Sequence, residues 1–176
     1  CCQAGIPLLY LQNTTGYIVG KSSEQAGMIK HGSKMIQAVA NATVPSITLM
    51  CGASFGAGNY GMCGRAYGPR FVFSWPNART AVLGGEQAAL TMRIVAEGGA
   101  KRRGVPVDEA QLRSLEQRII HNFDRQSDAF YTSGRNLDDG VIDPRDTRRV
   151  LGLAFDICRQ ADARVLRPMQ FGVARP

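Results

Sequence analysis

Histidine is scarce in this 176-residue chain, which contains only His31 and His121. Its five cysteines form no C-x-x-C pair, so a zinc site would need an unusual set of ligands. Aromatic residues make up 7% and do not alternate with the arginines, which argues against a stacking platform for single-stranded nucleic acid. No apolar run reaches the roughly 18 residues that span a bilayer. The sequence therefore predicts no metal, no nucleic acid and no membrane among the partners.

The chain also lacks an initiator methionine and begins at Cys1, just before an apolar run. We therefore expect a piece of a longer protein, and any targeting peptide would lie outside the sequence. The odd number of cysteines, mostly in apolar or helical surroundings, predicts buried and reduced thiols. The net charge of +7 favours anionic partners such as the phosphates of a cofactor.

The pattern of apolar residues predicts an α/β chain. Strands are expected at residues 6–12, 46–51, 70–75 and 79–83, and helices at residues 24–41, 57–63, 86–97, 108–125, 127–136 and 144–160. The first strand is almost entirely apolar, as expected for a strand buried on both faces. Ser23 is expected to cap the first helix and Asp143 the last, with Pro144 in its first turn.

A change of composition divides the chain. Residues 98–106 are interpreted as a basic connector between an α/β core at 1–97 and a helical extension at 98–176. Because successive loops of an α/β unit emerge at one edge of the sheet, the glycine-rich turns at 52–58 and 84–85 are expected to face one cleft.

The segment from Ser46 to Gly64 carries the most chemistry: an apolar strand runs into a turn of small residues and then a short helix. Gly56-Ala-Gly-Asn-Tyr-Gly61 fits the G-x-G-x-x-G dinucleotide fingerprint, which also requires an acidic residue about 20 positions later. No Asp or Glu lies between Gly61 and Glu86, which disfavours a nicotinamide or flavin site.

Two other interpretations remain. Gly52-Ala-Ser-Phe-Gly56 fits a nucleophile elbow with Ser54 as nucleophile, and Asp108 and His121 follow in hydrolase order. Asp108 and His121 both fall in or beside a charged helical stretch, however, where ordinary side chains on the solvent-exposed face of a helix would account for them. The alternative is an oxyanion hole, in which small residues let a ligand oxygen approach backbone N–H groups at a helix N-terminus. We favour the oxyanion hole.

Six blocks follow one another in an order that resembles a known family. They occupy residues 11–20, 30–35, 52–64, 70–78, 84–89 and 138–144. Together they resemble the C-terminal half of the carboxyltransferase, or β, subunit of biotin-dependent acyl-CoA carboxylases, over nearly the whole chain. The run from Gly56 to Met62 looks like the methylcrotonoyl-CoA and geranoyl-CoA subgroup.

The resemblance implies a crotonase-like (ClpP/crotonase) superhelix of ββα units with a helical C-terminal extension, the N-terminal carboxyltransferase half being absent. It implies a ligase that forms a C–C bond, with biotin carried on a biotin carboxylase/biotin carrier (α) subunit that uses ATP and bicarbonate. Coenzyme A would be the substrate handle, and other β subunits would complete a hexameric ring. The compartment would be the cytoplasm in a bacterium or the mitochondrial matrix in a eukaryote.

The resemblance also implies site residues. The backbone amides of Ala57 and Gly58 would bind the ureido oxygen of biotin, and a side chain introduced at position 58 would point toward the biotin ring. Contacts to biotin are expected from Ser54, Phe55 and Gly56, and the cleft is expected to include Asn13, Thr15, Gly16, Gly84 and Gly85. The reaction would be carboxyl transfer from carboxybiotin to an α,β-unsaturated branched acyl-CoA, with the biotin nitrogen as base. A serine hydrolase, or a crotonase-type hydratase or thioesterase without biotin, remains the alternative.

Overall fold

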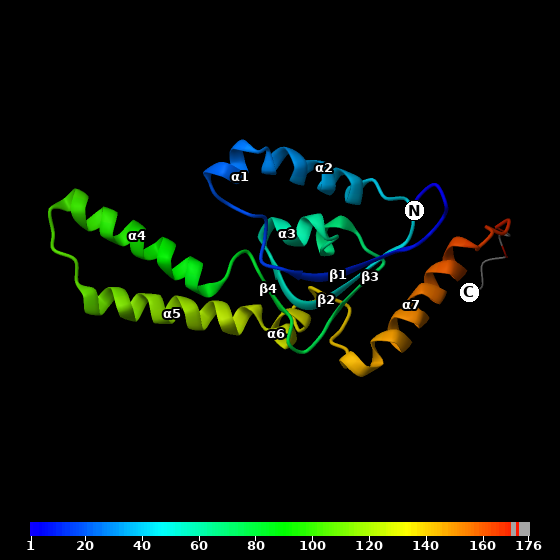
Figure 1. The fold of residues 1–176 in the computed structure, drawn as a ribbon. Coiled ribbons are helices and arrows are strands. Elements are labelled where there is room, and N and C mark those ends of the chain that lie inside the picture. Colours follow the sequence, from blue (N-terminus) through cyan, green and yellow to red (C-terminus); the bar gives the residue numbers. More distant parts are fainter. Residues whose placement is uncertain (170–171, 173–176) are drawn as a thin grey trace.

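A computed structural model describes residues 1–169 and 172 of the chain. A four-stranded, fully parallel sheet lies at its centre (Figure 1). The strands are β1 (Leu8–Thr14), β2 (Ser46–Phe55), β3 (Phe71–Ser74) and β4 (Arg79–Ala81). One side of β2 pairs with β1, and the other pairs first with β3 and then with β4. The predicted α/β class is confirmed, and all four strands form where they are expected.

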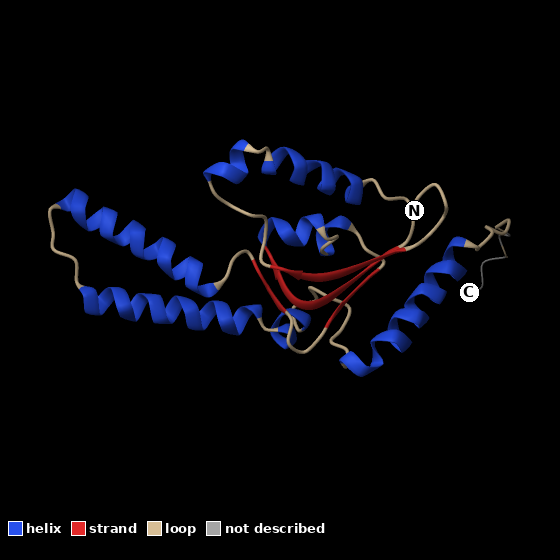
Figure 2. Ribbon diagram, viewed as in Figure 1, coloured by secondary structure: helices blue, strands red, loops and turns tan. Residues whose placement is uncertain are grey.

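Helices cover the sheet from two sides and also extend beyond it (Figure 2). They are α1 (Lys21–Gln25), α2 (Met28–Ala40), α3 (Gly56–Gly61), α4 (Gly85–Arg103), α5 (Glu109–Ser127), α6 (Ala129–Ser133) and α7 (Thr147–Asp162). α2 and α3 lie on one side and α7 on the other, while α4 and α5 form a hairpin that projects away from the sheet. No helix in the described part of the chain is long and apolar enough to cross a bilayer.

The main hydrophobic core joins β2 to α7. Ile47 and Leu49 of β2 are fully buried and pack against Leu151, Ala154 and Cys158 of α7. Burial of such aliphatic side chains is worth about 1.5–3 kcal/mol each. The last helix is therefore part of the same core as the sheet, and the division of the chain at residue 97 stays a prediction.

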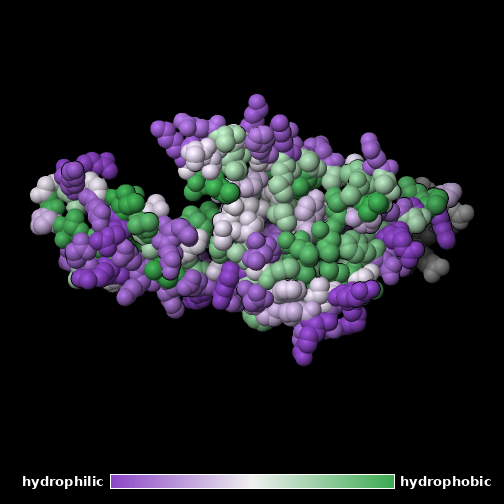
Figure 3. All heavy atoms as spheres, viewed as in Figure 1, coloured by the Kyte–Doolittle hydropathy of each residue, from purple (hydrophilic) through white to green (hydrophobic). Residues whose placement is uncertain are grey.

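The expectation that β1 is buried on both faces is wrong for the described residues. Leu9 and Leu11 are 41% and 55% exposed. Their register places them beside Ile47 and Leu49 on the face that α7 covers. The core of α7 packs on β2, however, and β1 lies at the edge of the sheet. Apolar surface is accordingly visible over the sheet region (Figure 3).

Two predicted helix boundaries are also wrong. The first predicted helix is broken into α1 and α2, because Gly27 adopts a left-handed conformation with φ of 89°. Ser23 lies inside α1, whose N-cap is Gly20. The predicted basic connector is instead the end of α4, which continues to Arg103 and stops at Gly104 with φ of 66°. Glycine permits these left-handed turns because it has no Cβ.

The α4–α5 hairpin is held by charge and by close packing. The Arg93 guanidinium bonds to Glu97 at 2.7 Å, to Glu109 at 3.0 Å and to Glu116 at 3.5 Å. At the base of the hairpin, a Cβ on Gly85 would lie 3.2 Å from the backbone of Ile120. The two helices can approach this closely only because Gly85 lacks a side chain.

The block from residue 138 to 144 closes the edge of β3 and starts the last helix. Asp138 is 5% exposed and accepts a hydrogen bond from the Ser74 hydroxyl at 2.6 Å. Asp143 caps a short 3-10 turn, Pro144–Asp146, that leads directly into α7: its carboxylate accepts from the backbone N–H of Arg145, and Pro144 begins the turn. The N-cap residue of α7 itself is Asp146, so the predicted cap is confirmed for the turn and not for the helix. Hydrogen bonds from Arg145 lower the pKa of Asp143 to about 2.

Candidate functional site

β2 extends further than the sequence suggests and carries a bulge. Gly52 to Phe55 belong to the strand, so the turn begins only at Gly56. The pairing with β1 shifts between Gln12 and Thr14, where β2 carries two more residues than β1. The Asn13 side chain fills this irregularity: its Oδ1 accepts from the N–H of Ala53 at 3.1 Å and leaves no room for a Cβ on Gly52. The bulge thereby redirects the end of β2.

The first turn of α3 presents backbone donors. Gly56, its first residue, has a φ of 53°, and a Cβ there would lie 2.9 Å from the Val82 carbonyl oxygen. No described side chain caps the helix at its N-cap residue, Phe55. The first N–H groups of a helix have no acceptor within the helix. The amides of Ala57 and Gly58 belong to this uncapped first turn.

A hollow of about 320 Å³ adjoins this turn. Its lining consists of Ser54, Gly56, Ala57, Asn59, Tyr60, Thr80, Ala81 and Val82. Ala57 is exposed, whereas Gly58 is buried. A Cβ on Gly58 would lie 2.9 Å from the Thr14 side chain and 3.0 Å from Gly16 Cα. The expectation that a side chain at 58 would point toward the ligand is therefore wrong, because that position faces the end of β1.

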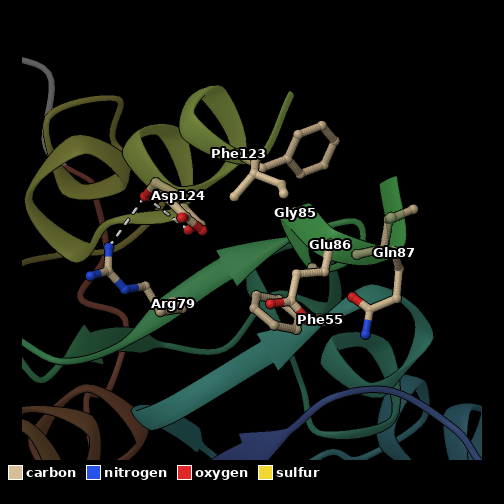
Figure 4. A pocket seen from close by; sticks show the side chains of 11 residues that line it. Phe55, Arg79, Gly85, Glu86, Gln87, Phe123 and Asp124 are labelled. Atoms are coloured by element: carbon tan, nitrogen blue, oxygen red, sulfur yellow. Dashed lines mark hydrogen bonds between the residues drawn. The ribbon is translucent and has the colours of Figure 1, made fainter. Parts of the chain in front are cut away.

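The second glycine-rich turn lies at the same edge of the sheet. Phe55 and the Gly84–Gly85 turn line a neighbouring hollow of about 300 Å³ (Figure 4). Arg79 borders this hollow, where it donates to the Asp124 carbonyl at 3.3 Å and pairs with Asp128 at 3.0 Å. The structure thus brings together the two turns that the sequence placed on one cleft, each with its own hollow.

The residues that follow β1 complete this edge. Gly16 lies against the β2–α3 junction, since its added Cβ would be 3.8 Å from the Phe55 carbonyl oxygen. The Thr14 hydroxyl accepts from the N–H of Gly16 at 3.3 Å, and Thr15 is exposed. Asn13 serves the bulge, while Thr15 and Gly16 lie beside the first turn of α3. Of the three predicted cleft residues, Asn13 therefore lies within β1, and Thr15 and Gly16 lie in the loop that follows it.

The geometry does not support the nucleophile elbow. Ser54 is fully buried; its hydroxyl donates to Gln12 Oε1 and accepts from Asn59 Nδ2 at 2.8 Å. Asp108 caps α5 at the far end of the hairpin, and His121 is exposed on α5. Neither of these two residues is a described hydrogen-bond partner of Ser54, so the Ser-His-Asp arrangement is not formed.

The dinucleotide interpretation also finds no support. The whole Gly56–Gly61 motif is α3 itself, whereas the fingerprint needs its glycines in a loop before a helix. No cluster of three or more potential metal ligands occurs among the described residues. All five cysteines are free; Cys1 and Cys2 are exposed, against expectation, because they precede the sheet. Burial raises the pKa of the Cys63 thiol, which makes it a poor nucleophile.

Sequence reasoning missed three residues that hold the site. Gln12 and Asn59 are the hydrogen-bond partners of Ser54. The Tyr17 ring fits against α2 and α3 where they have Gly32 and Gly61: an added Cβ would lie 2.6 Å and 2.7 Å from its atoms. A polar residue in an apolar strand was the available signal for Gln12. No comparable signal marked Asn59 or Tyr17, because their partners are distant in sequence.

Comparison with known proteins identifies the family of the chain. The family model of the carboxyl transferase domain matches residues 1–170. The chain is 51% identical over 173 residues to the probable biotin-dependent acyl-coenzyme A carboxylase beta2 subunit of Mycobacterium tuberculosis, covering 98% of the chain and 32% of that protein. It is 46% identical over 175 residues to the mitochondrial methylcrotonoyl-CoA carboxylase beta chain of Arabidopsis thaliana, covering 99% and 29%.

A solved structure agrees with these matches. The crystal structure of the geranyl-CoA carboxylase beta subunit of P. aeruginosa superposes with a TM-score of 0.88 at 54% identity, covering 99% of the chain and 32% of that subunit. The chain therefore has the crotonase-like fold of carboxyltransferases. It spans 29–32% of the length of these relatives. With the domain match extending over nearly all its residues, the chain belongs to the carboxyl transferase domain family.

Proposed function

We propose that this chain supplies the carboxybiotin side of a carboxyltransferase that acts on an α,β-unsaturated branched acyl-CoA, either methylcrotonoyl-CoA or geranoyl-CoA. The observation that supports this most directly is the first turn of α3. The amides of Ala57 and Gly58 lie in that uncapped turn, and Ala57 lines a hollow of about 320 Å³. The matched relatives are named for the carboxylation of these two substrates.

The lining of the hollow suits biotin. Ala57, Ala81 and Val82 present mostly apolar surface, which fits a ring system, and the two N–H groups fit a single polar oxygen. Bound carboxybiotin would supply the carboxyl group, a ureido oxygen that becomes negatively charged, and a ring nitrogen that takes the proton from the acyl-CoA. The role of the chain is to hold two fixed donors at that oxygen, each worth about 3 kcal/mol. No side-chain base is then needed, in keeping with the exposed position of His121.

The rest of the complex follows from the same proposal. The acyl-CoA would be held chiefly by the N-terminal half of another β subunit in a hexameric ring. The α subunit would use ATP and bicarbonate to load the biotin. The mitochondrial matrix would be the compartment in a eukaryote, as in the name of the Arabidopsis relative, and the cytoplasm in a bacterium.

Ala57→Val in the complete β subunit, assayed with its biotin-carrying partner, tests the proposal. The added methyl groups enter the hollow, so we expect carboxyl transfer and the decarboxylation of carboxybiotin to fall at least about tenfold through displacement of the oxygen from the amides. The dissociation constant for acyl-CoA should change little. Ala66→Val, an exposed position in a 3-10 turn, is the control. Weaker acyl-CoA binding with normal decarboxylation would assign this chain to the other half of the site.

Substrate choice is tested with the unaltered complete enzyme. Methylcrotonoyl-CoA, geranoyl-CoA and propionyl-CoA are compared at equal concentration, and kcat/KM is measured for each. We expect one of the two branched unsaturated substrates to exceed propionyl-CoA. A preference for propionyl-CoA would reject the subgroup and leave the carboxyltransferase proposal standing.

Ser54→Ala separates this proposal from a serine hydrolase. Loss of a nucleophile costs about 10⁶-fold in rate. Loss of a buried hydrogen-bonding hydroxyl should instead reduce carboxyl transfer by about ten- to a hundredfold. Any hydrolysis of acyl-CoA should proceed at the same rate in the unaltered enzyme and in the Ser54→Ala variant. Near-complete loss of a thioesterase activity with the fold intact would favour the hydrolase.

A further inference from the structure

Three polar side chains link β1, β2 and α3 behind the first turn of α3. Gln12 and Ser54 are completely buried, and Asn59 is partly buried. Asn59 Nδ2 donates to Ser54 Oγ at 2.8 Å, and Ser54 Oγ donates to Gln12 Oε1. Gln12 Nε2 in turn donates to the carbonyl oxygen of Met62, the C-cap residue of α3, at 2.7 Å. This chain of three hydrogen bonds therefore begins at a residue of α3 and ends at its C-cap.

The direction of donation in this network follows from the chemistry of its members. A carbonyl oxygen can only accept, so the group of Gln12 that faces Met62 must be its NH₂. Its Oε1 then faces Ser54, whose single proton goes to Gln12, so that Ser54 accepts from Asn59. Among the described residues, no ionisable side chain hydrogen-bonds to these three. Removing Ser54 takes the partner from both Gln12 Oε1 and Asn59 Nδ2, and removing Gln12 or Asn59 leaves the buried Ser54 hydroxyl with one of its two hydrogen bonds.

α3 depends on such external contacts for its position. It has six residues, and helices this short are not stable by themselves. Two glycines let its first turn approach neighbouring segments closely: an added Cβ would lie 2.9 Å from the Val82 carbonyl oxygen at Gly56 and 2.9 Å from the Thr14 side chain of β1 at Gly58. Gly64 also contributes, because a Cβ there would overlap the Asn59 amide group. The side chain of Asn59 is thus confined between the helix, β2 and the segment that follows α3.

We propose that Gln12, Ser54 and Asn59 form a positioning network that fixes the direction of the Ala57 and Gly58 amides for carboxyl transfer. This proposal rests on the proposed function of those amides. Ser54 and Asn59 border the hollow, but their hydrogen-bonded groups and those of Gln12 face one another and the Met62 carbonyl. We therefore assign the three side chains as positioning residues that act through α3. Preorganisation of donors is what gives an oxyanion hole its effect, so a loosened α3 would bind its substrates and react slowly.

The first test uses Asn59→Ala, Ser54→Ala and the double variant in the complete β subunit with its biotin-carrying partner. We expect each single change to lower kcat about ten- to a hundredfold, with the KM for acyl-CoA unchanged. Members of one network are non-additive, so the double variant should be little slower than the slower single variant. Hydrogen exchange of the amides at 56–61 should increase in the same variants. Asn41→Asp, an exposed change at the end of α2, is the control.

Asn59→Asp gives a second test that keeps the shape of the side chain. The ionised carboxylate cannot donate to Ser54, whereas the protonated carboxyl can. We therefore expect the rate of this variant, relative to the unaltered enzyme, to rise as the pH falls through the pKa of the introduced carboxyl. Asn41→Asp should show a flat ratio. This test decides the matter if Asn59→Ala does not fold.

The outcomes separate the two proposals. If Ala57→Val slows carboxyl transfer but Asn59→Ala does not, the positioning network is wrong and the proposed function stands. Additive effects of Asn59→Ala and Ser54→Ala, or a flat pH ratio for Asn59→Asp, also overturn the network. If Ala57→Val has no effect on either carboxybiotin reaction, the proposed function itself fails.

Discussion

Gly58→Val in the complete β subunit should reduce carboxyl transfer by about 10²–10³-fold, the loss associated with one oxyanion donor. A Cβ at this position would lie 2.9 Å from the Thr14 side chain and 3.0 Å from Gly16 Cα. The valine methyl groups would add to this conflict, so α3 must move away from the end of β1. The amides of Ala57 and Gly58 would move with it. Affinity for acyl-CoA should change little, because the other half of the site holds that substrate in the proposal.

The control for this substitution is Gly152→Val. Gly152 is also a helical glycine, on α7, and no described heavy atom lies within 4 Å of its added Cβ. Gly152→Val therefore makes the same glycine-to-valine change in a helix as Gly58→Val, without the steric conflict. Rates of carboxyl transfer and of carboxybiotin decarboxylation, and the dissociation constant for acyl-CoA, are measured for both variants. If Gly58→Val weakens acyl-CoA binding and spares decarboxylation, the proposed assignment of the two sides is reversed.

Gly56→Ala should have an effect of similar size for a different reason. Gly56 has a φ of 53°, which costs a residue with a Cβ about 1–2 kcal/mol. The added Cβ would also lie 2.9 Å from the backbone oxygen of Val82, which cannot rotate away as a flexible side chain could. The start of α3 must separate from the β4–α4 loop. We expect carboxyl transfer to fall by about 10²-fold or more as the hollow beside Ala57 changes shape.

Gly68→Ala is the matched control for this second prediction. Gly68 has a φ of 65°, and no described atom lies within 4 Å of its added Cβ. Gly68→Ala therefore carries the same cost of placing alanine in a left-handed conformation as Gly56→Ala, without the steric conflict. Thermal unfolding and carboxyl transfer are measured for both variants. Equal rates in the two variants would mean that the contact between Gly56 and Val82 does not position the site.

Local patterns in the sequence were sufficient for much of the fold. The four strands, the Asp143 cap with Pro144 and the helix that begins after Asp108 were all predicted, because each depends on residues within a few positions of one another. The two wrong helix boundaries both arose at glycines. Gly27 broke a helix that the apolar spacing had joined, whereas Gly98 and Gly99 were accommodated inside α4. The spacing of apolar residues carries no information on which glycines adopt a left-handed conformation.

The sequence by itself determined the class of fold and the family resemblance, and it marked the block from Gly52 to Gly64 as the candidate site. The tertiary structure alone decided how that block is built. It placed Ser54 in a buried network with Gln12 rather than beside His121, and it turned the side-chain position of Gly58 toward Thr14. The physical reason is that the surroundings of a small residue consist of atoms from distant segments, and those segments meet only when β1, β2 and β4 have paired.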